Sequence, residues 1–149
     1  MTLRLTLILM ALATSSCRAD GLHLAEAFAT KSSLELSQFL KDYSRSEISR
    51  YRYGNNQNVV HAATVNRENT DAVKQAVLYG ADVNHQDEEG RTPLHYAIDL
   101  DDLAKAKSLM ELGAATTIEN ASGFSAISFC AVVLRDQPRH KTCSFVVVN

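Results

Sequence analysis

The chain has 149 residues, of which 15 are basic and 17 are acidic, and its net charge at pH 7 is −2. This balance gives no basic footprint for nucleic acid, and the length suffices for one small domain with a modest core. Its cysteines and histidines do not occur at metal-ligand spacing, so we expect no metal and no other cofactor.

Residues 1–19 have the pattern of an export signal. Arg4 precedes a short apolar run, residues 5–13, which is too short to span a membrane and is followed by small residues. This order predicts a secretory signal peptide, bacterial in style. Two processing modes stay open. In one, Ser15-Ser16-Cys17 acts as a lipoprotein box, the signal ends at residue 16 and Cys17 is lipidated. In the other, cleavage follows Ala19.

Residues 20–55 are predicted to form a first helical unit with a long outgoing loop. Leu22-His23-Leu24-Ala25 opens the first helix, and the second is expected to end near Tyr43. The apolar positions that indicate this second helix are Leu34, Leu36, Phe39 and Leu40. Residues 44–55 are then expected to form the loop.

The middle of the chain repeats with a period of 33 residues. Gly80 and Gly90 recur as Gly113 and Gly123, since 113 − 80 and 123 − 90 are both 33. The repeated text is Gly80-Ala81-Asp82-Val83-Asn84 with Gly90-Arg91-Thr92-Pro93-Leu94-His95-Tyr96-Ala97, then Gly113-Ala114 with Gly123-Phe124-Ser125-Ala126-Ile127. Such a period is typical of stacked units that bury a core only against their neighbours.

At these residues the chain resembles the ankyrin-repeat family. Residues 92–97 match its T-P-L-H-x-A signature, and Val60-His61-Ala62-Ala63 repeats the L-H-x-A part, with Asn56 in place of the loop glycine. The resemblance implies an all-α solenoid of about three to four helix-turn-helix units with projecting loops. Two repeats then occupy residues 56–88 and 89–121, and the unit at 20–55 is a degenerate first one.

Residue chemistry supports this frame. Thr92 and Pro93 suit the first positions of a helix, and the four repeat glycines suit left-handed backbone at helix ends and loop tips. A second helix is expected from about Asp71 to Tyr79. The apolar positions expected on the buried sides of the two second helices are Val73, Ala76 and Val77, then Leu103, Ala106, Leu109 and Met110. The resemblance also implies that His95 is structural.

The last unit, residues 122–149, is predicted to be a truncated capping repeat. A helix is expected over residues 126–134, but Pro138 falls where a second helix needs a backbone donor. Residues 143–148 are β-branched without a helical period, so they either fold over the open end of the stack or are disordered. Cys130 and Cys143 remain as a pair after export, and they form a disulfide or stay as two free thiols.

The resemblance places protein contacts at the loop tips and at the starts of the first helices. The candidate binding residues are Arg52, Tyr53, Gln57, His85, Gln86, Glu88, Glu89, Arg91, Ile118, Glu119, Ser122 and Phe124. Phe124 and Tyr53 are the strongest candidates because exposed aromatic side chains often anchor interfaces. For Phe124 the alternative is that it packs onto the last unit.

No catalytic constellation occurs in the sequence, so we expect a binding protein and not an enzyme. The resemblance implies that it binds another protein, and the charge balance argues against nucleic acid. We expect a monomer when the chain is free. Its expected location is the periplasm, either soluble or anchored to a membrane through Cys17. The partner is expected to be a secreted toxin, which makes the chain an immunity protein, or an envelope enzyme that the chain stabilises or delivers. A hydrolase on this scaffold is the least favoured alternative.

Overall fold

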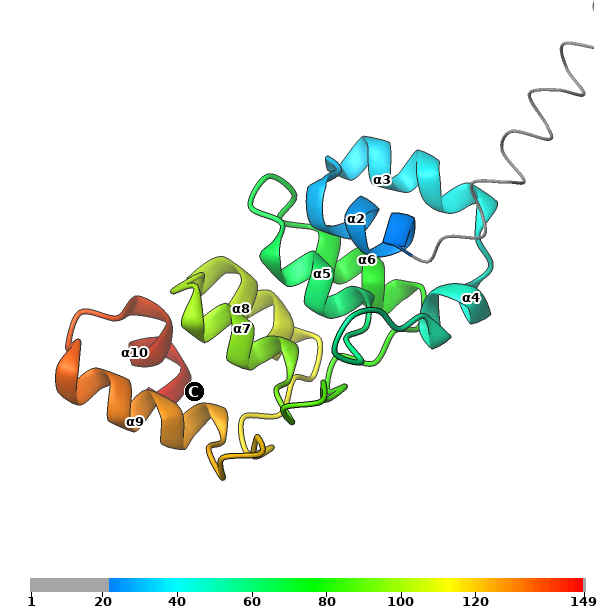
Figure 1. Ribbon diagram of the computed structural model, residues 1–149. Coiled ribbons are helices and arrows are strands. Elements are labelled where there is room, and N and C mark those ends of the chain that lie inside the picture. Colours follow the sequence, from blue (N-terminus) through cyan, green and yellow to red (C-terminus); the bar gives the residue numbers. More distant parts are fainter. Residues whose placement is uncertain (1–21, 149) are drawn as a thin grey trace, which may run out of the picture.

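The computed structural model describes residues 22–148, and within them the regular structure is helical (Figure 1). The elements are α2 (Leu22–Thr30), α3 (Ser33–Phe39), the 3-10 turn η2 (Leu40–Asp42), α4 (Arg45–Arg50), α5 (Val59–Val65), α6 (Ala72–Leu78), α7 (Pro93–Asp99), α8 (Leu103–Glu111), α9 (Ala126–Asp136) and α10 (Lys141–Val148). None of these helices is long and apolar enough to cross a membrane. The predicted signal peptide and Cys17 lie outside the described residues.

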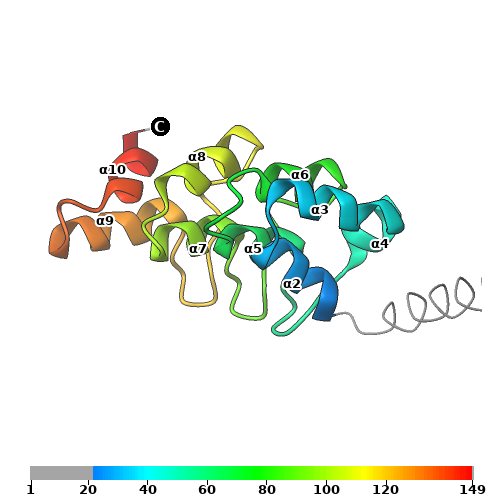
Figure 2. The same cartoon turned by 90° about the horizontal axis from the view of Figure 1, so that it is seen from above.

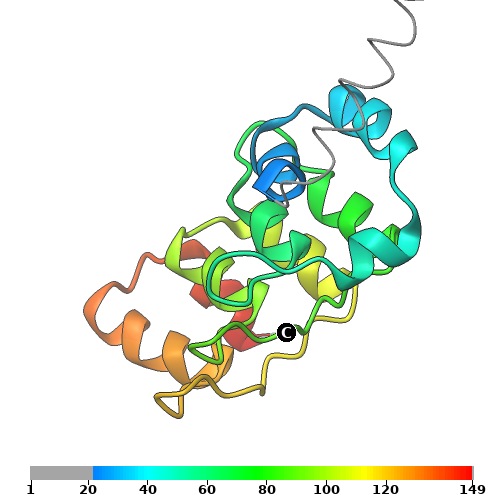
Figure 3. The same ribbon diagram turned by 45° about the vertical axis from the view of Figure 1, so that its right-hand side comes forward.

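The helices stack in two layers. Helices α2, α5, α7 and α9 form an inner layer, and α3, α6, α8 and α10 lie behind them as an outer layer (Figure 2). Each helix contacts its neighbour in the same layer and its partner in the same unit, so the core is a continuous band between the layers. The predicted all-α solenoid is therefore confirmed. Figure 3 shows α2 and α3 at one end of the stack and α9 and α10 at the other.

The inner helices start where the repeat text predicts. Helix α7 begins at Pro93, and the Thr92 N–H donates to His95 Nδ1 at 3.1 Å. In the unit before it, Asn58 Oδ1 accepts the Val60 N–H at 3.0 Å, so asparagine serves as the cap of α5. At the helix ends, Gly80 and Gly113 have φ values of 85° and 93°, in the left-handed region that the sequence predicts for them.

One charged side chain lies in the core. Lys105 of α8 is only 1% exposed, and its Nζ donates to the carbonyls of Ala63 at 3.1 Å and Asn69 at 2.5 Å. Burial lowers the pKa of this lysine, although Asp102 and Asp71 act in the other direction. Lys105 therefore joins the second repeat to the first through hydrogen bonds that the sequence pattern did not reveal.

The last unit has two helices, so the prediction of a truncated unit is wrong, and of the two alternatives for its tail the structure shows the one that folds over the open end of the stack. Helix α9 runs to Asp136, and α10 forms from Lys141 onward, so Pro138 lies in the turn and not in the second helix. Helix α10 packs against α8 and α9 and buries Thr142, Cys143 and Val146, and this burial outweighs its β-branched composition. A disulfide joins Cys130 to Cys143 with a Cα–Cα distance of 4.9 Å.

The first unit differs from the prediction in two ways. The expected loop over residues 44–55 contains α4, which starts with a capping box in which the Ser44 N–H donates to Glu47 Oε2 at 2.7 Å. Ile48 of this helix is fully buried, and Arg45 donates to the Leu78 carbonyl. His23 follows the same motif as His95 but is exposed. Helix α4 therefore fills space beside the first repeat.

Candidate functional site

Three tight loops project from one side of the stack, and we call them finger 1 (residues 53–57), finger 2 (residues 87–91) and finger 3 (residues 120–124) (Figure 2). Backbone hydrogen bonds close each loop: Tyr53 and Gln57 exchange two at 2.9 Å, Asp87 N–H donates to Arg91 at 3.1 Å, and Asn120 N–H donates to Phe124 at 2.9 Å. The fingers and the inner helices together make the finger face.

Side chains at the first positions of fingers 2 and 3 fix the shape of each turn. Asp87 Oδ1 accepts the N–H groups of Glu89 and Arg91 at 3.0 and 2.8 Å. Asn120 Oδ1 accepts the N–H of Phe124 in the same way at 3.0 Å. Burial acts to raise the pKa of Asp87, but hydrogen bonds from Tyr96, Arg91 and Glu89 outweigh it and lower that pKa. Asp87 is therefore an ionised turn residue.

Fingers 1 and 2 are joined to each other near their tips. The His85 ring contacts the Asn56 carbonyl through Nε2 at 2.7 Å, and the Glu88 N–H donates to the Asn55 carbonyl at 2.9 Å. Asn56 has a φ of 59°, which asparagine tolerates better than most residues, as the sequence predicts. These bonds hold the two loops side by side.

Fingers 2 and 3 are joined in the same manner. Gln86 Nε2 donates to the Glu119 carbonyl at 2.9 Å, and the Ala121 N–H donates to the Glu89 carbonyl at 2.8 Å. A Cβ atom on Gly90 would lie 2.8 Å from the Ala121 nitrogen, so only glycine permits this approach. The three fingers therefore form a connected row.

Two buried histidines support the fingers from below. His61 Nε2 contacts the Arg91 carbonyl at 3.1 Å, and His95 Nε2 contacts the Phe124 carbonyl at 3.0 Å. Burial lowers the pKa of His61 to about 4 and also lowers the pKa of His95. Both ring nitrogens of each histidine are engaged by neighbouring groups. His95 therefore has the structural role that the family resemblance implies.

A first pocket of about 550 Å³ opens on the finger face between α2, α5 and finger 1. Its lining residues are Ala25, Glu26, Ala29, Tyr53, Gln57, His61, Ala62, Val65 and Tyr96. The pocket exists because three alanines of α2 and α5 leave room where larger side chains would fill it. Val65 at its edge is 42% exposed. Its walls are mainly apolar, with one carboxylate from Glu26.

Tyr96 of α7 lines this pocket, and Arg91, which stacks on its ring, lines a second pocket. The Tyr96 hydroxyl donates to Asp87 Oδ2 at 2.7 Å, and the Arg91 guanidinium lies 4.3 Å from the ring centroid. Arg91 also forms an ion pair with Asp99. Burial, together with the hydrogen bond to Asp87 and the charge of that carboxylate, raises the pKa of Tyr96 to about 12. The Tyr96 hydroxyl is therefore protonated and neutral at pH 7, and the charged side chains of Asp87 and Arg91 hold the ring in place.

The second pocket, of about 320 Å³, lies between α7, α9 and finger 3. Its lining residues are Arg91, His95, Asp99, Asn120, Ser122, Phe124 and Phe129. Phe124 is 38% exposed and contacts Phe129 edge to face, with ring centroids 6.4 Å apart. Phe124 therefore packs on the last unit and also keeps an exposed surface.

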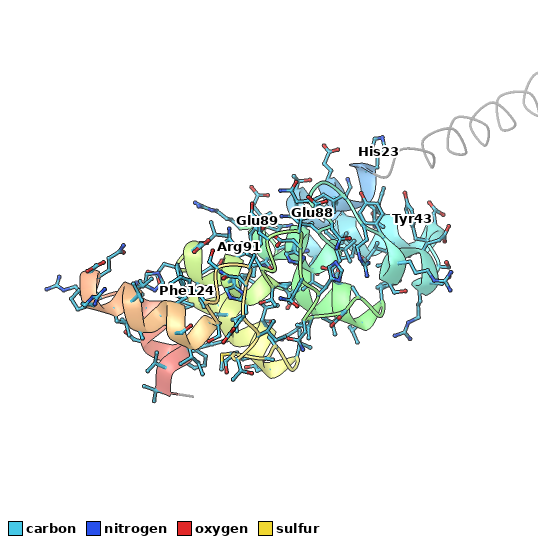
Figure 4. The ribbon with its side chains drawn as sticks, turned by 60° about the horizontal axis from the view of Figure 1, so that its bottom comes forward. His23, Tyr43, Glu88, Glu89, Arg91 and Phe124 are labelled. Carbon is cyan, nitrogen blue, oxygen red and sulfur yellow. A yellow bond between two sulfur atoms is a disulfide. The ribbon has the colours of Figure 1, made fainter. Side chains whose placement is uncertain are left out.

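The structure places the candidate binding residues in two groups. Those that are exposed are Arg52, Gln86, Glu88, Glu89, Glu119, Ser122 and Phe124, and those that are partly buried are Tyr53, Gln57, His85, Arg91 and Ile118. Figure 4 shows Glu88, Glu89, Arg91 and Phe124 along one side of the molecule. Tyr53 stacks on Tyr51 at 5.9 Å and lines the first pocket. It therefore forms a wall and does not project freely.

Sequence reasoning missed most of the pocket lining. Tyr96 stands at the x position of the family signature and was not singled out, yet it borders the first pocket. Glu26 and Val65 lie on inner helices, and Phe129 lies one turn after the start of α9. The only sequence signal for Glu26, Val65 and Tyr96 is their place on an inner helix, where each comes directly after a buried residue. No group of three metal-ligating side chains occurs between residues 22 and 148.

Comparison with known proteins agrees with this architecture. A family model described as "Ankyrin repeats (3 copies)" matches residues 22–136. The chain is also similar to the ADP-ribosylation factor GTPase-activating protein AGD2 of Arabidopsis thaliana, with 45% identity over 49 residues. That match covers 33% of this chain and 6% of AGD2, so the chain spans a small fraction of that relative's length.

Proposed function

Because the chain belongs to the ankyrin-repeat family, whose repeats are protein–protein interaction modules, we propose that its finger face binds another protein outside the cytoplasm. The observation that carries this proposal is the connected row of fingers. Loops that are hydrogen-bonded to one another lose little conformational entropy on binding, so their contacts contribute fully to affinity.

Phe124 is the anchor of this proposed interface. Its ring is fixed by the edge-to-face contact with Phe129 and remains 38% exposed at the mouth of the second pocket. A rigid aromatic side chain offers a large apolar contact area at low entropic cost. The exposed carboxylates of Glu88 and Glu89 stand on the neighbouring finger, where they are suited to steer the encounter.

The site of action that we propose is the periplasm or the membrane surface, and the partner is a secreted toxin that the chain neutralises. Two features support this choice. The predicted signal peptide at residues 1–19 would direct the chain to export. The disulfide between Cys130 and Cys143 is of a kind that persists in oxidising compartments.

Affinity capture from an envelope extract tests the binding function. The full chain should retain one specific protein, and Phe124→Ala should weaken that complex by roughly 1–3 kcal/mol, mainly through faster dissociation. Leu78→Ala is the matched control, because Leu78 is an apolar residue of the outer helix α6 that is 68% exposed. Equal losses in the two variants would contradict binding through the finger face. Retention of an envelope enzyme in place of a toxin would favour the stabilising role over immunity.

Mass spectrometry of the mature protein tests the export function. A chain that starts at a diacylglyceryl-modified Cys17 would identify the membrane-anchored form, and a start at Asp20 the soluble form. An intact Met1 on protein recovered from the cytoplasm would remove the basis for a periplasmic partner. That result would leave the binding function itself untouched.

A further inference from the structure

We infer that the segment bound in the first pocket is a basic, amphipathic stretch of the partner, with one large apolar side chain inserted in the pocket and lysine or arginine beside it. This inference rests on the proposed function, because it names the chemistry of what the finger face binds. It is drawn from the apolar walls of the pocket and from the carboxylates around it.

The apolar part of the argument concerns the pocket itself. Ala25, Ala29 and Ala62 form its floor, and the rings of Tyr53 and Tyr96 form its sides. The pocket of about 550 Å³ has room for a phenylalanine, leucine or methionine side chain, and burial of such a side chain is favourable. The wall residues supply few polar partners, so a purely polar segment would leave its groups unsatisfied.

The electrostatic part concerns carboxylates in the pocket wall and on the finger beside it. Glu26 lines the pocket from the α2 side. Glu88 lies on finger 2 and donates its N–H to Asn55 of finger 1, which lines the pocket through Tyr53 and Gln57, and Glu89 is the next residue. All three residues are exposed, and no side-chain hydrogen bond or ion pair engages them within residues 22–148. These carboxylates are therefore available to a partner cation.

Arg91 and Arg52 bring positive charge to the neighbourhood of the pocket. Arg91 is paired with Asp99 and stacked on Tyr96, so its charge is compensated within the molecule. Arg52 donates to the carbonyls of Ser49 and Tyr51 at 2.9 and 2.7 Å, which directs it to the backbone beside finger 1. The carbonyls leave the charge of Arg52 uncompensated, but the carboxylates of Glu26, Glu88 and Glu89 outnumber it, so the face around the first pocket is acidic on balance.

Panning a random dodecapeptide library on the full chain tests this inference without a known partner. The enriched peptides should carry an excess of lysine and arginine over aspartate and glutamate, together with at least one large apolar residue. For such a peptide, Glu88→Lys with Glu89→Lys should lower the affinity at least about tenfold, and the affinity of the unaltered chain should fall as salt is raised.

Two matched controls show whether a loss of affinity depends on where the charge or the bulky side chain is placed. Glu68→Lys with Glu111→Lys makes the same charge change at exposed positions away from the fingers, and the affinity should stay within about twofold. Val65→Trp should abolish binding by filling the pocket from its exposed edge, whereas Leu78→Trp on α6 should not.

Three outcomes would overturn the inference. They are acidic or wholly polar enriched peptides, equal losses in the two charge-reversed variants, and no enrichment above that on an unrelated protein. None of these would overturn the proposed function, which is judged by the effect of Phe124→Ala on capture of a whole protein. If Phe124→Ala and Leu78→Ala weakened capture of the whole protein equally while basic peptides were still enriched, the proposed function would be overturned instead.

Discussion

The interior of the stack and its first unit use the same four-residue motif in opposite ways. In the interior, His95 is 3% exposed, and its ring joins the Thr92 region to finger 3. In the first unit, His23 stands in the same motif but faces solvent (Figure 4). The difference teaches that the motif alone does not specify the contact, because the closed finger 1 follows the first unit and yet His23 remains exposed.

The two ends of the stack also differ from the interior in what replaces the missing neighbour. At the first unit, α4 and its buried Ile48 fill the space beside the repeat. At the last unit, the disulfide holds α10 on α9, and Asp101 accepts the Thr142 N–H at 2.9 Å. Packing protects one end, whereas a covalent bond protects the other.

The largest expected effect is on the last unit. Replacing Cys130 and Cys143 by serine should lower the free energy of unfolding by about 3 kcal/mol, because the bond closes a loop over a sequence separation of 13 residues. Denaturant unfolding with and without reductant measures it. Reductant should destabilise the unaltered protein and leave the double variant unchanged. Equal midpoints for all four samples would show that packing alone holds this end.

The histidine comparison gives the next largest effect. His95→Ala should destabilise by about 2 kcal/mol, because it leaves the buried Thr92 N–H without its partner and removes one of the two hydrogen bonds to the Phe124 carbonyl. His23→Ala should change stability by less than about 0.5 kcal/mol, since the residue is exposed. Thermal unfolding of both variants measures the contrast. Similar losses in the two would refute the difference between interior and end.

The next comparison is between Gly90 in finger 2 and Gly113 at the end of helix α8. Gly113→Ala should cost about 1 kcal/mol, because alanine resists the positive φ of 93° although nothing lies within 4 Å of the new Cβ. Gly90→Ala should cost more, since its Cβ would also collide with Ala121 in finger 3. Chemical denaturation ranks the two. If Gly113→Ala were the more damaging, the junction between the fingers would contribute little to stability.

The smallest expected effect is on pH dependence. The pKa of His61 is lowered by burial to about 4 in the folded chain, below its ordinary value of 6.5, so the unfolded chain binds the proton more readily between these values. Stability is therefore complete above the ordinary value and falls as the pH drops toward 4. At about pH 5.5 the loss should be about 1 kcal/mol. His61→Gln should flatten this slope, and an unchanged slope would assign it to other groups.

The repeating part of the fold could be predicted from the sequence because each signal in it is local. Gly113 follows a helix, Pro93 opens one, and the same spacing returns in the next unit. In the end units the sequence predicted α2, α3 and α9, but it did not predict α4 and α10. Helix α10 has a β-branched sequence, and α4 has no repeat equivalent, so the stability of both comes from burial against distant residues.

The candidate binding residues at the loop tips could be predicted from the sequence, and those farther from the tips could not. Glu88, Glu89 and Phe124 were identified from their turn positions and lie exposed on the fingers. The first pocket was not identified, because it is made by small residues of two helices that meet only in the fold. Lys105 was missed for a related reason: its partners are backbone carbonyls, which leave no trace in the side-chain pattern.

The bonds between fingers have a consequence for how the loops open to solvent. The N–H groups of Glu88 and Ala121 lie at loop tips, where amide hydrogens usually exchange with water at once. Here each is donated to a carbonyl of a neighbouring finger, at 2.9 and 2.8 Å. Exchange at either position requires two adjacent loops to separate. Deuterium uptake at these tips should therefore be slow and correlated, because the three fingers open to solvent together.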